Sequence, residues 1–508
     1  MDKQHYMKFI YQHMIKKSNS PALYFQAFAM PSLFIAVLSV FSTHIFAHSM
    51  SYEEAEQQAL QSSYTTQANS ALEQAARLDA EATKGLGLPR VDLNVRAYKF
   101  HSEVDVPLDS FKQNLENTLS ERLSDQLNQW SGTIPSDVLS NIQNGVNGVI
   151  QNGINQFPNY ANLTVEDEVI RPTISLVMPI YTGGLIKSAK QIATIQAMRA
   201  QLSTEQQQDI RRFEIIQSYF NVQLQQQLVK SSQFNLDAMQ LHANNALKLE
   251  KQGFISKGQR MQFEVARNNA QRLLQNAQSN LESSQFQLNH LLHQQQFSDL
   301  STALFVNVTR AQPINQFLTT YPDQSTLIRK MQVDTQLADE NIKAQRAAKK
   351  PNLFAFAEYS LDKNENWIVG IVARYNLFGG LDKTKTIQSA ELKRYASELL
   401  VERTKQEVEN IIQKSYSEMI SAQKTQQLLQ ENKQAALENL RIQNLSFKEN
   451  MGTANQVIDA QNALNVLDSE MAINAYKYVM SLATLLQSHG SIDQFKTYLN
   501  QPNTVYIR

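Results

Sequence analysis

The sequence contains no cysteine, few turn-forming residues and no excess of charge of either sign. Without cysteine the chain has no disulfides, thiolate metal sites, cysteine nucleophiles or lipid on an N-terminal cysteine, which is compatible with an oxidising compartment. Only 15 glycines and 12 prolines interrupt 508 residues, as expected for a mostly helical chain with rare turns. Lys and Arg total 47, as do Asp and Glu, and this balance argues against a nucleic-acid partner.

Long apolar runs are rare as well. One run begins at Leu33 after a basic leader and ends near Ala47, and its pattern predicts a secretory signal peptide over residues 1–47. An uncleaved membrane anchor is the alternative, and a start at Met30 would give a more ordinary signal. Because no comparable run follows Ala47, no further transmembrane helix is expected.

No pattern of residues predicts catalysis. His290 and His293 are three apart and could share a metal, but no third ligand is evident, so ordinary surface histidines are favoured. The glycine-containing segment Lys84–Pro89 precedes a strand pattern instead of following one, which excludes a phosphate-binding loop. No nucleophile elbow is present. We therefore expect a chain that is not an enzyme and that binds neither a metal nor a cofactor.

What the sequence does contain is one pattern that occurs twice. The segments MPIYTGGLIK at 178–187 and RYNLFGGLDK at 374–383 each end a strand-like run, turn on a glycine pair and open a long helical pattern. The pairs, Gly183 with Gly184 and Gly379 with Gly380, are 196 positions apart (379 − 183). This spacing predicts an internal duplication of helix, strand, strand, joint, long helix, tip and returning helix.

The duplication sets the expected boundaries of the chain. The first repeat, 48–292, is expected to contain strands over about 90–101 and 170–181, an inserted loop over about 102–168 and a helical hairpin over 185–292. The second, 293–487, is expected to contain an irregular link over 293–316, a helix over 324–349, strands over 352–361 and 367–378, and a hairpin over 381–487. Residues 488–508 are expected to form a polar tail, and the insertion is expected to face outside.

Strand length connects this pattern to a membrane. A strand of about ten residues crosses a bilayer when tilted, and strands cross lipid only in a closed barrel. Known single-chain barrels have at least eight strands, so four strands must share a barrel with other copies, and three copies supply twelve. The long helical patterns, roughly 100 Å each, need coiled-coil partners. The expected fold class is an α+β membrane protein, a trimeric twelve-stranded β-barrel continued by a barrel of long antiparallel helices.

The joints, the duplicated plan and the two tips together resemble the TolC family of bacterial outer-membrane efflux and type I secretion ducts. The tips are KQGFIS at 251–256 and NMGTANQVIDAQ at 450–461, and the second is similar to the family's pattern of a glycine followed by Asp-Val-Leu-Asp-Ala-Gln. The resemblance covers nearly all of the chain after Ala47. It implies a homotrimer in outer-membrane lipid with a large periplasmic portion, a periplasmic adaptor and an inner-membrane transporter of the ABC, RND or MFS type. The chain would conduct drugs, metals or proteins passively.

The resemblance also implies roles for individual residues. Asp459 matches an aspartate of the family's pore constriction, and Gln456 stands where a second aspartate is usual, so the resting gate would depend on weaker polar contacts. Asp459 is alternatively an ordinary solvated charge near a helix start. The adaptor would dock on the tip residues Gly253, Phe254, Ser256, Asn450, Met451, Gly452 and Thr453.

Two alternatives stay open from the sequence. The aromatic residues Tyr359, Trp367 and Tyr375 fit either a girdle at the lipid interface or simple packing. A secreted coiled-coil structural or filament protein would also be helical and cysteine-free. Such a protein needs no paired alternating strands that lead into glycine pairs at matched positions, and the strands therefore favour the channel.

Overall fold

The computed structural model describes residues 49–99, 168–293, 299–309, 311–361, 366–449 and 451–508, together with positions 119, 145, 146, 149 and 153. The predicted signal peptide, most of the insertion and Asn450 lie outside the described residues. Residues 47–508 belong to one compact unit. None of the described helices has both the length and the hydropathy that a membrane-spanning helix requires.

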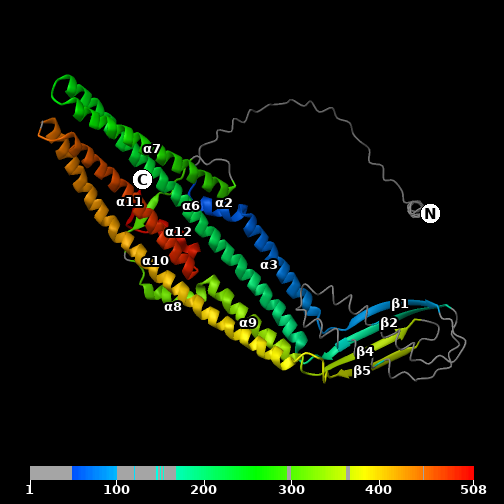
Figure 1. Ribbon diagram of the computed structural model, residues 1–508. Helices are drawn as coiled ribbons and strands as arrows, with labels where there is room; N and C mark the ends of the chain where they lie inside the picture. Colours follow the sequence, from blue (N-terminus) through cyan, green and yellow to red (C-terminus); the bar gives the residue numbers. More distant parts are fainter. Residues whose placement is uncertain are drawn as a thin grey trace, which may run out of the picture. The chain divides into compact units, whose positions relative to one another are not determined.

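Two very long helices organise the described chain, and each is followed by a shorter returning helix (Figure 1). The first hairpin is α6 (Leu185–Lys251) with α7 (Lys257–Leu292), and the second is α10 (Lys383–Lys448) with α11 (Ala454–His489). Helices α6 and α10 contain 67 and 66 residues. At 1.5 Å per residue each is roughly 100 Å long. Together with the four-stranded sheet described below, these helices confirm the predicted helix-rich α+β class.

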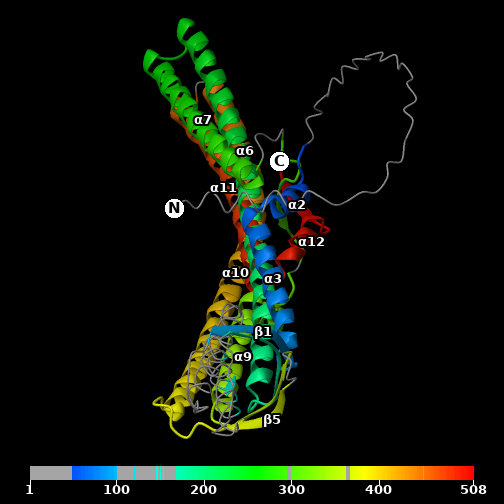
Figure 2. The same ribbon diagram turned by 90° about the vertical axis from the view of Figure 1, so that its right-hand side faces the viewer.

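Shorter helices complete the pairing along both long ones. They are α2 (Tyr52–Ser62), α3 (Tyr64–Ala82) with the short 3-10 turn η1 (Thr83–Gly85), α8 (Ile314–Gln324) and α9 (Thr326–Ala347). Helix α3 packs on α6, and α9 packs on both α6 and α10, as Figures 1 and 2 show. The helix expected over 324–349 is α9, which begins just after the buried Ser325, where the chain bends and α8 ends.

Within the described residues, four antiparallel strands form one sheet in the order β1-β2-β4-β5. The strands are β1 (Arg90–Lys99), β2 (Glu168–Tyr181), β4 (Asn352–Ser360) and β5 (Trp367–Arg374). In register, Val177 lies opposite Phe356, and Phe356 lies opposite Gly370. The strand expected over 367–378 ends four residues earlier, because its partner β4 begins at Asn352, opposite Arg374.

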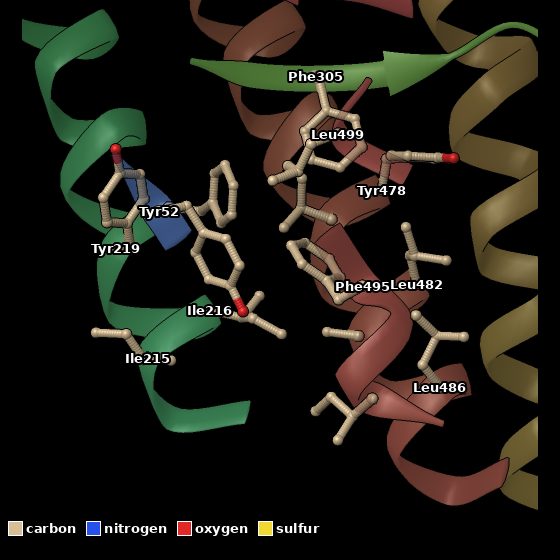
Figure 3. Packing of buried hydrophobic residues seen from close by; sticks show 14 of the residues in the cluster. Tyr52, Ile215, Ile216, Tyr219, Phe305, Tyr478, Leu482, Leu486, Phe495 and Leu499 are labelled. Carbon is tan, nitrogen blue, oxygen red and sulfur yellow. The ribbon is translucent and has the colours of Figure 1, made fainter. Parts of the chain in front are cut away.

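The largest core lies midway along the helices and includes both ends of the compact unit. Its centre is aromatic, since Tyr52, Tyr219, Phe220, Phe305 and Phe495 pack with ring centroids 5.3 to 6.0 Å apart. Figure 3 shows Tyr52, Tyr219, Phe305 and Phe495 in this core. All five side chains are fully buried. The core therefore joins α2, α6 and the segments that precede α8 and follow α11.

The C-terminal segment is not the polar tail that the sequence predicts. The turn η2 (Ile492–Gln494) and α12 (Phe495–Leu499) insert Ile492, Phe495 and Leu499 into the core. The last strand, β6 (Thr504–Ile507), pairs with β3 (Leu304–Asn307), which lies in the link expected to be irregular. Each strand is too short for a clear alternation, so only their pairing makes them recognisable.

Two buried tyrosines of this core have opposite hydrogen-bonding states. The Tyr219 hydroxyl donates to the carbonyl oxygen of Met50 at 2.8 Å and accepts from the Thr302 amide at 3.0 Å. The Tyr52 hydroxyl is buried without a hydrogen-bond partner among the described residues. Tyr219 thus ties the start of the described chain and the link to α6.

A partly buried ionic cluster lies beside the core. Arg212 Nε is 3.2 Å from a Glu56 carboxylate oxygen, and its Nη1 is 3.2 Å from Asp209 Oδ1. The Thr326 hydroxyl, at the start of α9, donates to Asp209 Oδ2 at 3.1 Å. Burial raises the pKa of the Glu56 and Asp209 carboxyls above their usual values, and these contacts offset that effect only in part.

Candidate functional site

The sheet has two chemically different faces. One face carries exposed apolar side chains from all four strands, and Trp367 and Val369 are 71% and 66% exposed. The other members of this face are Val91, Leu93, Val95, Ile170, Ile174, Ile180, Tyr359 and Ile371. The opposite face, called the polar face below, carries polar residues of β1 and β2, with the Asn94 amide donating to the Ser175 hydroxyl at 3.0 Å. It also carries Phe354, Phe356 and Val372. A sheet whose large apolar residues are exposed on one side only requires an apolar environment on that side.

The first strand-to-helix joint depends on two glycines with left-handed backbone. Gly183 and Gly184 have φ of +65° and +102°, and α6 begins immediately afterwards. A Cβ on Gly183 would lie 2.6 Å from the carbonyl oxygen of Ala347 and 2.7 Å from Cβ of Lys350. Helix α9 ends against this joint, so Gly183 is required for both its backbone angle and its close approach.

The second joint has the same residue pair but a different geometry. Gly380 has φ of +71°, whereas Gly379 is not in the left-handed region. Helix α10 begins three residues later, at Lys383, where the Asp382 carboxylate accepts hydrogen bonds from the amides of Thr384 and Lys385 at 2.9 and 3.1 Å. The two glycine pairs are therefore not equivalent, although the sequence predicts one role for both.

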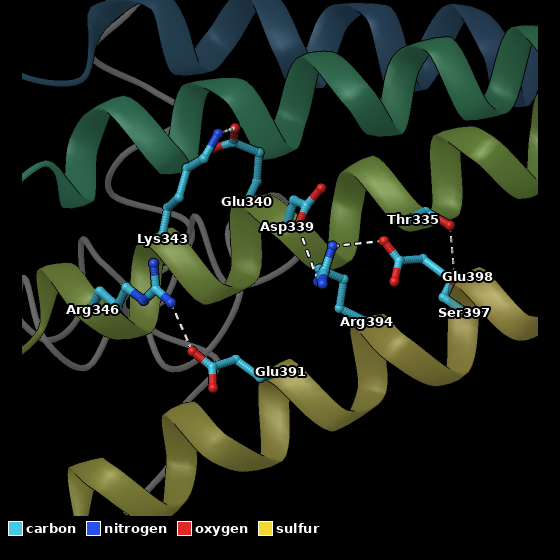
Figure 4. Close-up of polar contacts among 9 residues, drawn as sticks. All are labelled: Thr335, Asp339, Glu340, Lys343, Arg346, Glu391, Arg394, Ser397 and Glu398. Carbon is cyan, nitrogen blue, oxygen red and sulfur yellow. Dashed lines mark hydrogen bonds and ion pairs between the residues drawn. The ribbon is translucent and has the colours of Figure 1, made fainter.

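Polar contacts hold the start of α10 against α9 beside these joints (Figure 4). The Arg346 guanidinium lies 2.7 Å from Glu391, and Thr335 and Ser397 share a hydrogen bond of 2.8 Å. Arg394 lies between Asp339 at 3.6 Å and Glu398 at 2.6 Å. The exposed ion pairs add little stability individually, and their effect is to set how the two helices align where the strands end.

At the far ends of both hairpins, the tips share one capping motif. The Ser256 hydroxyl accepts from the Gln259 amide at 3.2 Å, and the Gln259 side chain accepts from the Ser256 amide at 2.9 Å. Thr453 and Gln456 form the same reciprocal pair, at 3.4 and 2.7 Å. Each capping box satisfies two amides that a helix start leaves without partners. Tips built in the same way are expected to present similar surfaces.

The long helices also end alike. The Phe254 amide donates to the carbonyl oxygen of Leu249 at 2.9 Å, after Gly253 with φ of +79°. The Met451 amide makes the corresponding bond to Ser446 at 2.8 Å. These bonds give donors to carbonyl groups that the helix ends leave without partners, and the chain turns sharply there.

The two tips pack against each other. Phe263 of α7 and Phe447 of α10 meet edge to face, with ring centroids 5.4 Å apart. Ala243, Ala246, Ile255, Ala454 and Val457 complete this small core. Arg260 lies 2.5 Å from Glu250 and also pairs with Glu264, which closes the first tip. Phe254 and Met451 stay exposed, at 59% and 78%, so the joined tips present apolar side chains at their surface.

The structure places the predicted constriction residues on the exposed side of α11. Gln456 and Asp459 are both exposed, and the Gln456 amide oxygen is engaged in its capping box. Just beyond them, α7 and α11 border a groove of about 670 Å³ that contains Met261, Val265, Ile458 and Asn462. A role for Asp459 and Gln456 at a pore constriction remains a prediction, because it depends on neighbouring copies.

The described residues contain no metal site. His290 and His293 have ring centroids 6.4 Å apart, and His293 instead ends α7 and contacts Tyr64. No group of three or more possible metal ligands occurs within the described residues. The sequence reasoning missed other features, namely the packed tips, the docked C-terminal segment and four residues of the insertion on the sheet. Of these, only the insertion carries a usable signal, because Gly145, Val149 and Gly153 are spaced four apart.

Comparison with solved structures agrees with these features. The outer-membrane protein VceC of Vibrio cholerae aligns over 86% of this chain and 96% of its own, with 13% identity and a TM-score of 0.66. The CmeC outer-membrane channel of Campylobacter jejuni aligns over 87% and 86%, with 11% identity and a TM-score of 0.66. The open MtrE channel of Neisseria gonorrhoeae aligns over 87% and 89%, with 15% identity and a TM-score of 0.63.

No protein-family profile and no curated protein sequence matches the chain. The likeness therefore lies in the arrangement of helices and strands, which survives at sequence identities where side chains have diverged. The chain has the fold of the TolC-type outer-membrane channels.

Proposed function

We propose that this chain is one protomer of an outer-membrane channel that passively conducts exported substrates out of the cell. The observation that carries the proposal is the exposed apolar face of the sheet, which fits lipid on that side and water on the polar side. In the chain alone, β1 and β5 are edge strands of this sheet. Open edges are not tolerated in lipid, so the edges must pair with other copies.

A homotrimer meets this requirement with twelve strands in one closed barrel. The helices would then extend into the periplasm and form a tunnel, and the duplicated plan would supply two hairpins per copy. The exposed residues of the joined tips would dock onto a periplasmic adaptor. That adaptor links the channel to an inner-membrane transporter of the ABC, RND or MFS type, in a tripartite efflux pump or a type I secretion system.

Two charge substitutions on β5 test the proposal. Val369 belongs to the exposed apolar face, whereas the neighbouring Ile368 points to the polar face. A lysine on a lipid-facing site costs about 2–4 kcal/mol near the bilayer midplane. We expect Val369→Lys to reduce the yield of trimer in outer-membrane fractions sharply, and Ile368→Lys to leave the yield close to that of the wild type.

The same pair discriminates against a secreted filament protein. In water an exposed Val369→Lys removes an apolar side chain from solvent and leaves folding unchanged or improved. Equal yields for both variants, together with a wild-type chain that fractionates as a soluble monomer, would refute the channel. Detergent-extracted protein that crosslinks to a trimer, and opens pores in planar bilayers, would support it.

A further inference from the structure

A groove near the tips combines apolar walls with amide side chains. It has a volume of about 670 Å³ and lies where α7 and α11 run along α6, on which both helices pack (Figure 1). The small side chains of Ala266 and Ala270 line it on α7, and Ala270 packs in the buried apolar cluster that also contains Leu236 and Leu274. The volume is that of a pocket for a small molecule.

Asn235 of α6 is the residue that points to a ligand. Its side chain lines the groove and is only 2% exposed, and its Oδ1 atom has no hydrogen-bond partner within the described part of the chain. One turn earlier on α6, the buried Ser231 hydroxyl donates to Oδ1 of Asn465 at 2.7 Å, so that position has a partner on α11. A buried polar atom without a partner is costly, and a hydrogen-bond donor in the groove would satisfy Asn235.

The walls of the groove define the chemistry of the molecule that carries this donor. Val265 of α7 and Val466 of α11 line the groove and are 59% and 51% exposed, and Leu273 extends the apolar surface. Arg272 is exposed and is the only ionisable side chain among the described residues that line the groove. A molecule with an apolar body, a hydrogen-bond donor and an acidic group matches these surfaces.

We propose that this groove binds small amphipathic acids, with the donor group of the ligand on Asn235 and its acidic group beside Arg272. Asp459, the nearby carboxylate of α11, is not among the residues that line the groove. A molecule bound there contacts α6 and α7 of the first hairpin and α11 of the second, and it therefore bridges the two hairpins. The site lies within one chain and goes beyond the proposed function, since binding needs neither a barrel nor a transporter.

Protection of an introduced thiol tests the site directly, since the chain has no native cysteine. The probe is 8-anilinonaphthalene-1-sulfonate, which has an aromatic body, an amine donor and a sulfonate. The full chain in detergent is dialysed against the probe so that the free probe concentration is fixed. At about ten times its Kd, the probe should slow the reaction of N-ethylmaleimide with Val265→Cys about ten-fold, and that with Val466→Cys likewise. Gln271→Cys is the matched control, because Gln271 is exposed on α7 and does not line the groove, so its rate should not change.

Two comparisons identify the groups that bind the probe. N-phenyl-1-naphthylamine has the same aromatic body and amine without the sulfonate, and it should bind about two- to five-fold more weakly, as expected for one exposed ion pair. Arg272→Gln should lower the affinity for the sulfonate probe to that for the neutral probe, and leave the latter unchanged. Asn235→Leu should weaken the binding of both probes. The unliganded Asn235→Leu protein should melt at the same or a higher temperature than the wild type, because a buried atom without a partner is removed.

The outcomes separate the binding site from the channel. Rates for Val265→Cys and Val466→Cys that are the same with and without either probe would overturn the site, and would mean that water alone satisfies Asn235. Thiols that are unreactive even without a probe would also overturn it, because another copy of the chain then fills the groove. Either result in a protein that forms trimers and pores would leave the proposed channel intact. Protection by the probe in a chain that forms no trimer would support the site and refute the channel.

Discussion

The first joint provides the sharpest test of how the strands connect to the helices. An alanine in the left-handed region costs about 1–2 kcal/mol, and at Gly183 and Gly184 the backbone has φ of +65° and +102°. At Gly183 the added Cβ would also overlap the carbonyl oxygen of Ala347, at 2.6 Å. Overpacking of this kind costs typically about 1–3 kcal/mol more. Gly184 has open space around it, so only the backbone cost applies there.

We therefore expect Gly183→Ala to destabilise the chain by about 2–5 kcal/mol and Gly184→Ala by about 1–2 kcal/mol. Gly379→Ala is the matched control, because Gly379 has no positive φ and its added Cβ would meet only the movable Asn376 amide. It should change stability by less than about 1 kcal/mol.

The assay is thermal unfolding in detergent, followed by the far-ultraviolet circular dichroism of the helices. For a cooperative unit of this size, 1 kcal/mol shifts the melting temperature by roughly 1 °C. Gly183→Ala should therefore melt a few degrees below Gly379→Ala, with Gly184→Ala between them. Identical melting temperatures for all three variants would refute the reasoning that the joint needs a left-handed, closely packed glycine.

Three further changes test other parts of the molecule. Thr453→Ala removes the cap of α11 and should cost about 1 kcal/mol, seen as faster hydrogen exchange in the first turn of α11. Tyr219→Phe leaves the partly buried Thr302 amide without its acceptor and removes one of two hydrogen bonds to the Met50 carbonyl, so it should lower the free energy of unfolding by about 1–3 kcal/mol, whereas Tyr52→Phe should leave it unchanged or raise it. Burial raises the pKa of Glu56, so the folded state binds its proton more tightly than the unfolded state does. Lowering the pH from 7 towards 5 should therefore stabilise the wild type relative to Glu56→Gln, as read from the difference in melting temperature.

Each of these changes has its own control. Thr453→Ser keeps the capping oxygen, and exchange as fast as in the alanine variant would contradict the cap. The two tyrosine variants control for each other, since equal losses would mean that packing and not hydrogen bonding sets the effect. For Glu56, a difference in melting temperature from the glutamine variant that does not change with pH would show that folding does not shift the pKa of this carboxyl. The pH-dependent stabilisation is complete once the pH falls below the ordinary carboxyl pKa, which Glu56 has in the unfolded chain.

Local patterns in the sequence predicted the regular elements well. The long helical patterns after the glycine pairs identified α6 and α10, and the strands expected over about 90–101 and 170–181 correspond to β1 and β2. Glycine pairs marked the strand-to-helix joints. These features are predictable because each depends on residues a few positions apart, where helix and strand periods and backbone angles are decided.

Predictions failed where short segments depend on distant partners. The sequence predicts a polar tail over residues 488–508, yet Phe495 is fully buried against rings of α2, α6 and β3. The sequence also did not show that the Gln456 side chain caps its own helix, while its place at a pore constriction stays a prediction. In both cases the sequence contained the relevant residues, but not the contact that gives them a role.

The sequence by itself determined the helix lengths, the alternating strands, the joints and the resemblance to outer-membrane ducts, because period and spacing are local properties. Only the tertiary structure decided that the tips pack through Phe263 and Phe447, that β6 pairs with β3, and that Val149 lies on the polar face of the sheet. These contacts join segments separated by many tens of residues. Their energy comes from burying apolar surface between elements, and a linear pattern contains no record of which surfaces meet.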